Sequence, residues 1–130
     1  MNILIPADIE NEIRKAIKDY LTAYVRPLPD NFSVPNILIA CSGGTSSNTI
    51  DDFTTTLQAR AETDAEALEY LNTAIGILET QAKNQCGALR HVEINSLASW
   101  GSDPVRPDLK LATATVIVTA HRENFTIPES

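Results

Sequence analysis

A stretch of ten residues in the middle of the chain, 52–61, constrains the fold more than any other feature. Small or apolar side chains alternate with polar ones: Phe53, Thr55, Leu57, Ala59 and Ala61 against Asp52, Thr54, Thr56, Gln58 and Arg60. A period of two places each set on its own face of a β-strand. One buried face and one polar face are typical of an antiparallel sheet. We therefore expect a strand here, with one face against a core.

Two other stretches have the period of a helix. Residues 9–24 carry an apolar stripe at steps of three and four, and Asp8 is a candidate N-cap. The pattern ends at residues 26–30, where two prolines exclude a helix. A second helix is predicted from the capping box Thr63-Asp-Ala-Glu66, and Gly87 suits its C-terminal end.

Three further segments are predicted strands: residues 32–42, 89–98 and 109–120. The segments 43–50 and 99–108 lack either period and are predicted loops. The expected fold class is α+β, in the order α-β-β-α-β-β, with two helices packed on one face of a mostly antiparallel sheet of about four strands. We expect a single domain over residues 1–130, with flexible ends at 1–6 and 122–130. One core should contain Leu57, Leu71, Ile75, Leu78, Val116 and Val118.

The charge balance limits the classes of partner. Ten basic and 17 acidic residues give a net charge of −7. That charge argues against binding nucleic acid through a basic face and against a polybasic membrane anchor. No apolar run approaches the ~20 residues of a membrane span, so no membrane partner is expected. Cys41 and Cys86 lie far apart in no metal-binding motif, which indicates a reduced, intracellular protein.

Motifs for catalysis and cofactor binding are absent from the sequence. There is no GxxxxGK[ST] phosphate loop and no GxSxG nucleophile motif. Ser42-Gly43-Gly44 is better explained as part of a mobile loop between two strands than as a phosphate site. The only histidines, His91 and His121, fall on predicted strands, with no clustered carboxylates to complete a metal site. We predict that the protein is not an enzyme and has no catalytic, cofactor-binding or metal-binding residues.

Trp100 is the residue most suited to an interaction. It is the only tryptophan, and it lies in a segment rich in Gly, Asp and Pro. It is either an anchor that folds back on its own core or an exposed aromatic that docks another chain. Residues 103–107 form either a stiff turn or a presented interaction loop. The candidate interface residues are Gly43, Gly44, Trp100, Asp103 and Arg106.

Taken together, these motifs resemble the tail terminator (tail completion) proteins of long-tailed bacteriophages and prophages. The resemblance covers about residues 9–121. It includes the apolar strand ending in Ser42-Gly43-Gly44 and the 103–107 loop before a Thr/Val-rich strand. It also includes residues 60–67, Arg-Ala-Glu-Thr-Asp-Ala-Glu-Ala, which fit the family's helix start x-A-x-T-x-x-E-A. Related head-tail joining (neck) proteins share some of these motifs.

The resemblance implies a structural virion protein. Such subunits close into a ring, usually a hexamer, that caps the tail tube, ends its growth and joins the tail to the head. The partners implied are further copies of the chain, the tail tube protein and a neck or head-completion protein. DNA would pass through the bore without specific binding, in keeping with the acidic charge. The implied location is the virion tail, after assembly in the host cytoplasm. The alternative is a small intracellular α+β module that binds a ligand or has a regulatory role, dimeric through a sheet edge.

Overall fold

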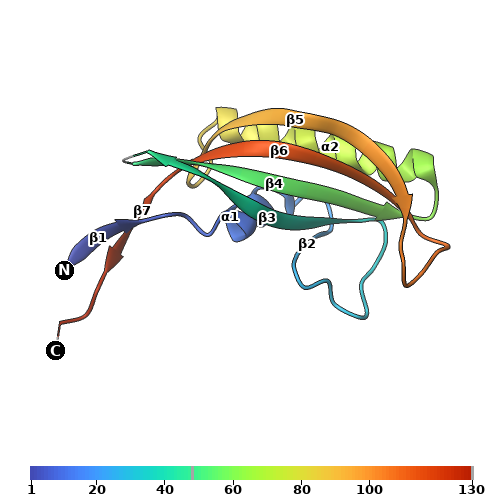
Figure 1. Ribbon diagram of the computed structural model, residues 1–130, viewed down its shortest axis with the longest axis horizontal. Helices are drawn as coiled ribbons and strands as arrows, with labels where there is room; N and C mark the ends of the chain where they lie inside the picture. Colours follow the sequence, from blue (N-terminus) through green and yellow to red (C-terminus); the bar gives the residue numbers. More distant parts are fainter. Residues whose placement is uncertain (48, 130) are drawn as a thin grey trace.

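The computed structural model describes residues 1–47 and 49–129, and it contains two sheets and two helices (Figure 1). The described elements are β1 (Asn2–Ile5), α1 (Ile9–Ile17), β2 (Ala23–Val25), β3 (Asn36–Ser47), β4 (Ile50–Ala61), α2 (Asp64–Lys83), β5 (Leu89–Ser102), β6 (Lys110–His121) and β7 (Glu123–Thr126). Five strands form one sheet in the order β2-β3-β4-β6-β5, and β1 pairs with β7. Every pairing is antiparallel except that of β2 with β3.

The predicted fold class is wrong in its strands and in their order. The structure has seven strands in two sheets where the sequence predicted about four in one sheet. The additional strands β1, β2 and β7 have only four, three and four residues. Segments this short carry too few residues for a period to be recognised. They are strands because a partner segment distant in sequence supplies their hydrogen bonds.

The predicted helix over 9–24 is also too long. Helix α1 ends at Ile17, and residues 23–25 pair in parallel with residues 37–39 of β3. The Arg14 side chain supports this arrangement, since its Nε donates to the Ala23 carbonyl oxygen at 3.0 Å. Tyr20 belongs to the predicted apolar stripe, yet it is exposed. Asp8 precedes the helix but makes no side-chain capping hydrogen bond.

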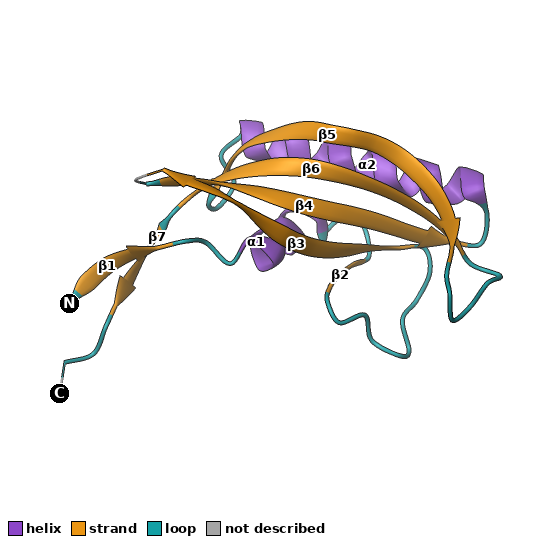
Figure 2. Cartoon of the chain, viewed as in Figure 1, coloured by secondary structure: helices purple, strands orange, loops and turns teal. Residues whose placement is uncertain are grey.

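Both helices cover the same face of the five-stranded sheet (Figures 1 and 2). Helix α2 lies along β4, β6 and β5, and α1 packs beside β2 and β3. The core between these layers contains all six predicted residues, each buried: Leu57, Leu71, Ile75, Leu78, Val116 and Val118. The predicted start of the second helix is confirmed, because the Thr63 hydroxyl accepts the Glu66 N–H at 3.2 Å.

Most of the first predicted loop, 43–50, is strand. Residues 43–47 continue β3 and pair with residues 50–54 of β4, after a register shift between Cys41 and Gly43. Gly43 has φ +135°, a conformation that other residues rarely adopt. A Cβ on Gly44 would lie 1.9 Å from the Asp52 carbonyl oxygen, so the close strand approach requires glycine. Asn48 of this predicted loop lies outside the described residues.

The second predicted loop, 99–108, is also shorter than expected. Residues 99–102 belong to β5 and pair with residues 110–113 of β6. The predicted ends 1–6 and 122–130 contain the two strands of a ribbon, in which Asn2–Ile5 pair with Glu123–Thr126. This ribbon projects from the body beside the two chain termini (Figure 1).

Candidate functional site

Trp100 lies on the edge strand of the main sheet. It pairs with Ala112 of β6, which places it on the face that carries the helices. Its exposed fraction is 53%, so it is not an anchor buried in the core. Two further apolar side chains of β5 are exposed, Ile94 and Leu97, and Leu97 reaches 77%. We call Ile94, Leu97 and Trp100 the β5 strip.

The β5 strip lies on a strand with one unpaired edge. Strand β5 is last in the strand order and has β6 as its one neighbour. Its register shifts between Ile94 and Ser96 and again between Ser96 and Ser99. Such bulges interrupt the regular row of edge hydrogen-bonding groups and hinder direct strand addition. The strip therefore offers side chains, rather than backbone, to another surface.

Asp103 has a buried, structural position within the protein. Its side chain is 6% exposed, and its Oδ2 accepts the Arg60 Nε–H at 2.6 Å. Its Oδ1 accepts the backbone N–H groups of Val105 and Arg106. Burial alone raises the pKa of Asp103, but the hydrogen bonds from Arg60, Val105 and Arg106 and the Arg60 charge lower it below its ordinary value. Asp103 thus holds the turn between β5 and β6 against β4.

Arg106 lies near the surface of this same turn. Its guanidinium and that of Arg60 each lie 5.8 Å from the centre of the Phe32 ring, within the range of a cation–π contact. The connector 26–35 and the turn enclose a hollow of about 300 Å³ here, lined by Phe32, Arg60, Arg106 and their neighbours. Two buried atoms, Asn36 Oδ1 and Arg60 Nη1, have no hydrogen-bond partner among the described residues. Cross-strand pairing places Asn36 opposite Arg60, so the two unpaired atoms belong to neighbouring side chains.

Gly43 and Gly44 lie far from Trp100 in the sheet order. They contribute to a hollow of about 270 Å³ beside Asp51 and Arg122. Asp51 is buried; its pKa is lowered by a hydrogen bond from the Ser46 hydroxyl, and further by Arg122, against the effect of burial. The structure therefore brings Trp100, Asp103 and Arg106 together at one end of the sheet and leaves Gly43 and Gly44 elsewhere.

Sequence reasoning missed the two Asp–Arg pairs, Arg60–Asp103 and Arg122–Asp51. Arg60 occupies a polar position of the alternating stretch, which predicts a solvent-exposed side chain. The signal that could have identified it is the pair of proline-containing segments, 26–35 and 103–107, that cover this end of the polar face.

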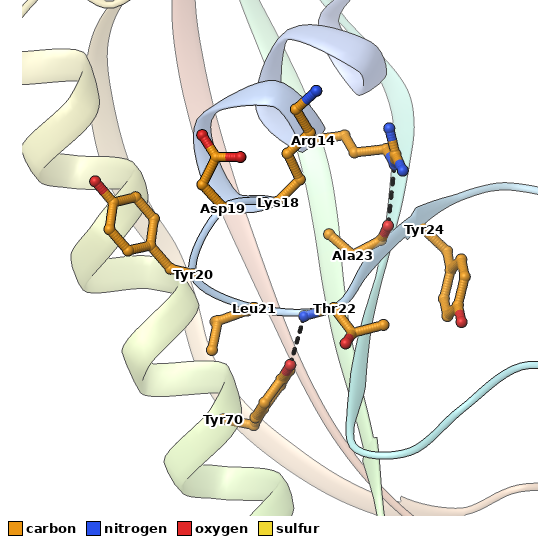
Figure 3. Close-up of a pocket in the computed structure, with 9 residues that line it drawn as sticks. All are labelled: Arg14, Lys18, Asp19, Tyr20, Leu21, Thr22, Ala23, Tyr24 and Tyr70. Atoms are coloured by element: carbon orange, nitrogen blue, oxygen red, sulfur yellow. Dashed lines mark hydrogen bonds between the residues drawn. The ribbon is translucent and has the colours of Figure 1, made fainter.

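A further hollow, of about 410 Å³, lies between the 18–24 segment and α2 (Figure 3). Some of its polar groups have structural partners within the protein. The Tyr70 hydroxyl accepts the Thr22 N–H at 2.6 Å, and Arg14 donates to Ala23. Figure 3 shows Lys18 and Asp19 where α1 ends, above the Thr22–Tyr70 hydrogen bond. Its lining contains no cysteine, serine or histidine.

The described residues contain no cluster of three His, Cys, Asp or Glu side chains that could hold a metal ion. Within the same residues, no helix has the length and apolar character needed to cross a membrane. Comparison with protein-family models gives no match, and no curated protein matches this chain significantly.

Proposed function

We propose that this protein is a structural ring subunit of the tail terminator type, which caps a phage tail tube and joins the tail to the head. The observation that carries the proposal is the β5 strip. Ile94 and Trp100 pair with Val116 and Ala112 and so share one face of the edge strand, and Leu97 lies exposed in the bulge between them. Large exposed apolar side chains grouped on one surface mark sites of association.

The composition of the strip suits a protein partner. Tryptophan is among the residue types that dominate interface energies. The two bulges of β5 favour packing of side chains over open-ended strand addition. A ring is a finite assembly, so an edge that resists open-ended growth suits a closed oligomer.

The net charge of −7 is compatible with a bore that DNA traverses. An acidic wall repels phosphates and leaves the DNA free to move. The partners proposed are five further copies of the chain, a tail tube protein and a neck protein, in the virion tail.

The first test is the mass and shape of the purified protein. We expect native mass spectrometry to give six copies and negative-stain electron microscopy to show closed rings. Trp100→Asp should dissociate the ring while far-UV circular dichroism stays unchanged. The matched control, Thr113→Asp, lies on β6 on the opposite face of the sheet and should retain the ring. A monomer at high concentration would contradict the proposal.

The second test addresses the tail itself. Genes for a tube protein and a neck protein should flank the gene for this chain. In a phage that carries it, Trp100→Asp should give overlong tails or tails without heads. Normal tail length and normal head joining in that variant would show that the strip has no role in tail completion.

A further inference from the structure

The hollow beside Phe32 is lined by a buried arginine whose hydrogen bonding is incomplete. The Arg60 side chain is 8% exposed, and its Nε–H donates to Asp103 Oδ2 at 2.6 Å. Its Nη1 has no hydrogen-bond partner in the part of the chain that the structure describes. Asn36 Oδ1, across the strand pair, is unpaired as well, so it does not serve as the acceptor. A buried guanidinium with unused donors is stabilised by a further acceptor.

A second guanidinium lies at the same hollow. The Arg106 side chain is 51% exposed, and its guanidinium lies 5.8 Å from the centre of the Phe32 ring, as that of Arg60 does. The ion pair of Arg106 with Asp108, at 3.4 Å, is exposed to water and is therefore weak. Two arginine side chains, one buried and one open to solvent, thus lie near one aromatic ring.

The acidic groups of the hollow balance only part of this positive charge. Asp103 accepts hydrogen bonds from Arg60 Nε and from the backbone N–H groups of Val105 and Arg106. Its single charge balances one of the two guanidinium groups. Asp30, the other acidic residue of the lining, is exposed, so water and salt screen its charge. An anion in the hollow would therefore meet an arginine charge that no buried carboxylate balances.

The rest of the lining is apolar. It consists of Leu28, Pro29 and Phe32 from the connector 26–35, and of Pro104 and Val105 from the β5–β6 turn. The volume of about 300 Å³ lies at the lower end of the range for small-molecule sites. Apolar walls with a few convergent polar groups are typical of such sites.

We infer that this hollow binds a small carboxylic acid with an apolar body, of the size of an acid with one aromatic ring. The carboxylate would accept hydrogen bonds from Arg60 and Arg106, because the planar guanidinium fork matches a planar carboxylate. The apolar body would lie against Phe32 and Val105. Free phosphate has no apolar surface to place against these walls. The site goes beyond the proposed ring function and does not depend on it.

Binding of 3-phenylpropionate to the purified protein tests the site. Saturation-transfer difference NMR at neutral pH applies to a monomer and to a large ring alike. We expect saturable binding with a Kd below about 1 mM. The control ligand, 3-phenylpropanamide, has the same apolar body without the charge. It should bind at least about tenfold more weakly, because it cannot form charge-assisted hydrogen bonds with the arginines.

Two substitutions that each remove one positive charge test whether the hollow is the site. Arg106 and Lys83 are both exposed, and Lys83 lies on α2, outside the lining of the hollow. Arg106→Gln should raise the Kd for 3-phenylpropionate at least about tenfold. Lys83→Gln should leave it unchanged. Val105→Asp, which adds a negative charge at the mouth of the hollow, should weaken binding as Arg106→Gln does. Thermal melting checks that each variant is folded.

Three results would overturn the inference: no saturable binding up to about 10 mM, equal affinity for the acid and the amide, or unchanged affinity in Arg106→Gln. The oligomeric state, measured on the same samples, separates the site from the proposed function. A ring that binds the acid supports both. A monomer that binds it supports the site and contradicts the ring. A ring that does not bind it overturns the site alone, and a monomer that does not bind it contradicts both.

Discussion

Strand β4 has an Asp–Arg pair near each of its ends, and the two pairs differ in burial. Near the C-terminal end, Arg60 contacts Asp103 at 2.6 Å, and the two side chains are 8% and 6% exposed. Near the N-terminal end, Asp51 contacts Arg122 at 3.2 Å, and Arg122 is 25% exposed. The buried pair fastens the β5–β6 turn to the sheet, and the more exposed pair fastens the base of the ribbon.

The β5–β6 turn is therefore held by a fully buried ion pair, whereas the β1–β7 ribbon is held by a partly exposed one. Burying a charge is costly unless its partner is present, so the Arg60–Asp103 pair must remain intact whenever the domain is folded. Water screens the Arg122–Asp51 pair in part. The Arg122–Asp51 pair therefore contributes less than a fully buried pair would to holding the ribbon on the sheet.

The largest effect expected is that of Asp103→Ala. It leaves the Arg60 guanidinium buried without its carboxylate and removes the acceptor for two backbone N–H groups. We expect the free energy of unfolding to fall by about 3–5 kcal/mol, measured by urea denaturation. Asp108→Ala, an exposed position of the same turn, is the control and should change it by less than about 0.5 kcal/mol. Equal effects would mean that the pair does not hold the turn.

Leu71→Ala measures how much the core between α2 and the sheet contributes to the free energy of unfolding. Leu71 is fully buried between α2 and the sheet. Its truncation should lower the free energy of unfolding by about 2–4 kcal/mol, through lost burial and a residual cavity. A loss below about 0.5 kcal/mol, again by urea denaturation, would mean that α2 does not cover the sheet as described.

Asp51→Ala should have a smaller and more local effect. We expect a loss of about 1–2 kcal/mol, because Asp51 accepts hydrogen bonds from Ser46 and Arg122. Hydrogen exchange should show lost protection of the β1 and β7 amides and retained protection in α2. Uniform loss of protection over the whole chain would contradict the separation of ribbon and body.

Acid should weaken both Asp–Arg pairs. The lowered pKa values of the two carboxyl groups predict that the protein loses stability as the pH falls. The pKa of Asp103 and that of Asp51 are lowered in the folded protein. Each carboxylate therefore contributes stability above its ordinary pKa of 3.8, and that stability is lost as pH falls through the lower folded value. Denaturation at a series of pH values below about 5 should show a shallower decline for Asp103→Asn than for the unmodified protein. An identical decline would mean that Asp103 does not contribute to the acid sensitivity.

Trp100→Ala should have the smallest effect on the stability of the isolated protein. Its side chain is half exposed and lies outside the core, so the thermal midpoint should change little. The same variant should weaken assembly, which analytical ultracentrifugation measures. Unfolding of the subunit would instead make Trp100 a structural anchor of the β5–β6 turn.

The sequence predicted two kinds of feature: motifs whose hydrogen-bond partners lie a few residues away, and helices or strands whose hydrophobic periodicity extends over many residues. The capping box at Thr63, the twenty-residue helix that follows and the inward residues of β4 and β6 were all predictable. The helix and the two strands each show a pattern of ten or more residues that distinguishes one face from the other, and the capping box is a local four-residue motif. The core residues follow from these patterns, because apolar faces must be buried together.

Only the tertiary structure decided the short strands and the buried charges. Residues 23–25 form a strand because their backbone pairs in parallel with β3. The ribbon forms because residues 2–5 near one end of the chain pair with residues 123–126 near the other. The burial of Arg60 depends on two loops that fold over one end of the polar face. The serines and glycines of 43–47 predict a loop, and it is their pairing with β4 that makes them a strand. These features depend on contacts between residues distant in sequence, whereas the helix period and the strand alternation are properties of a single segment.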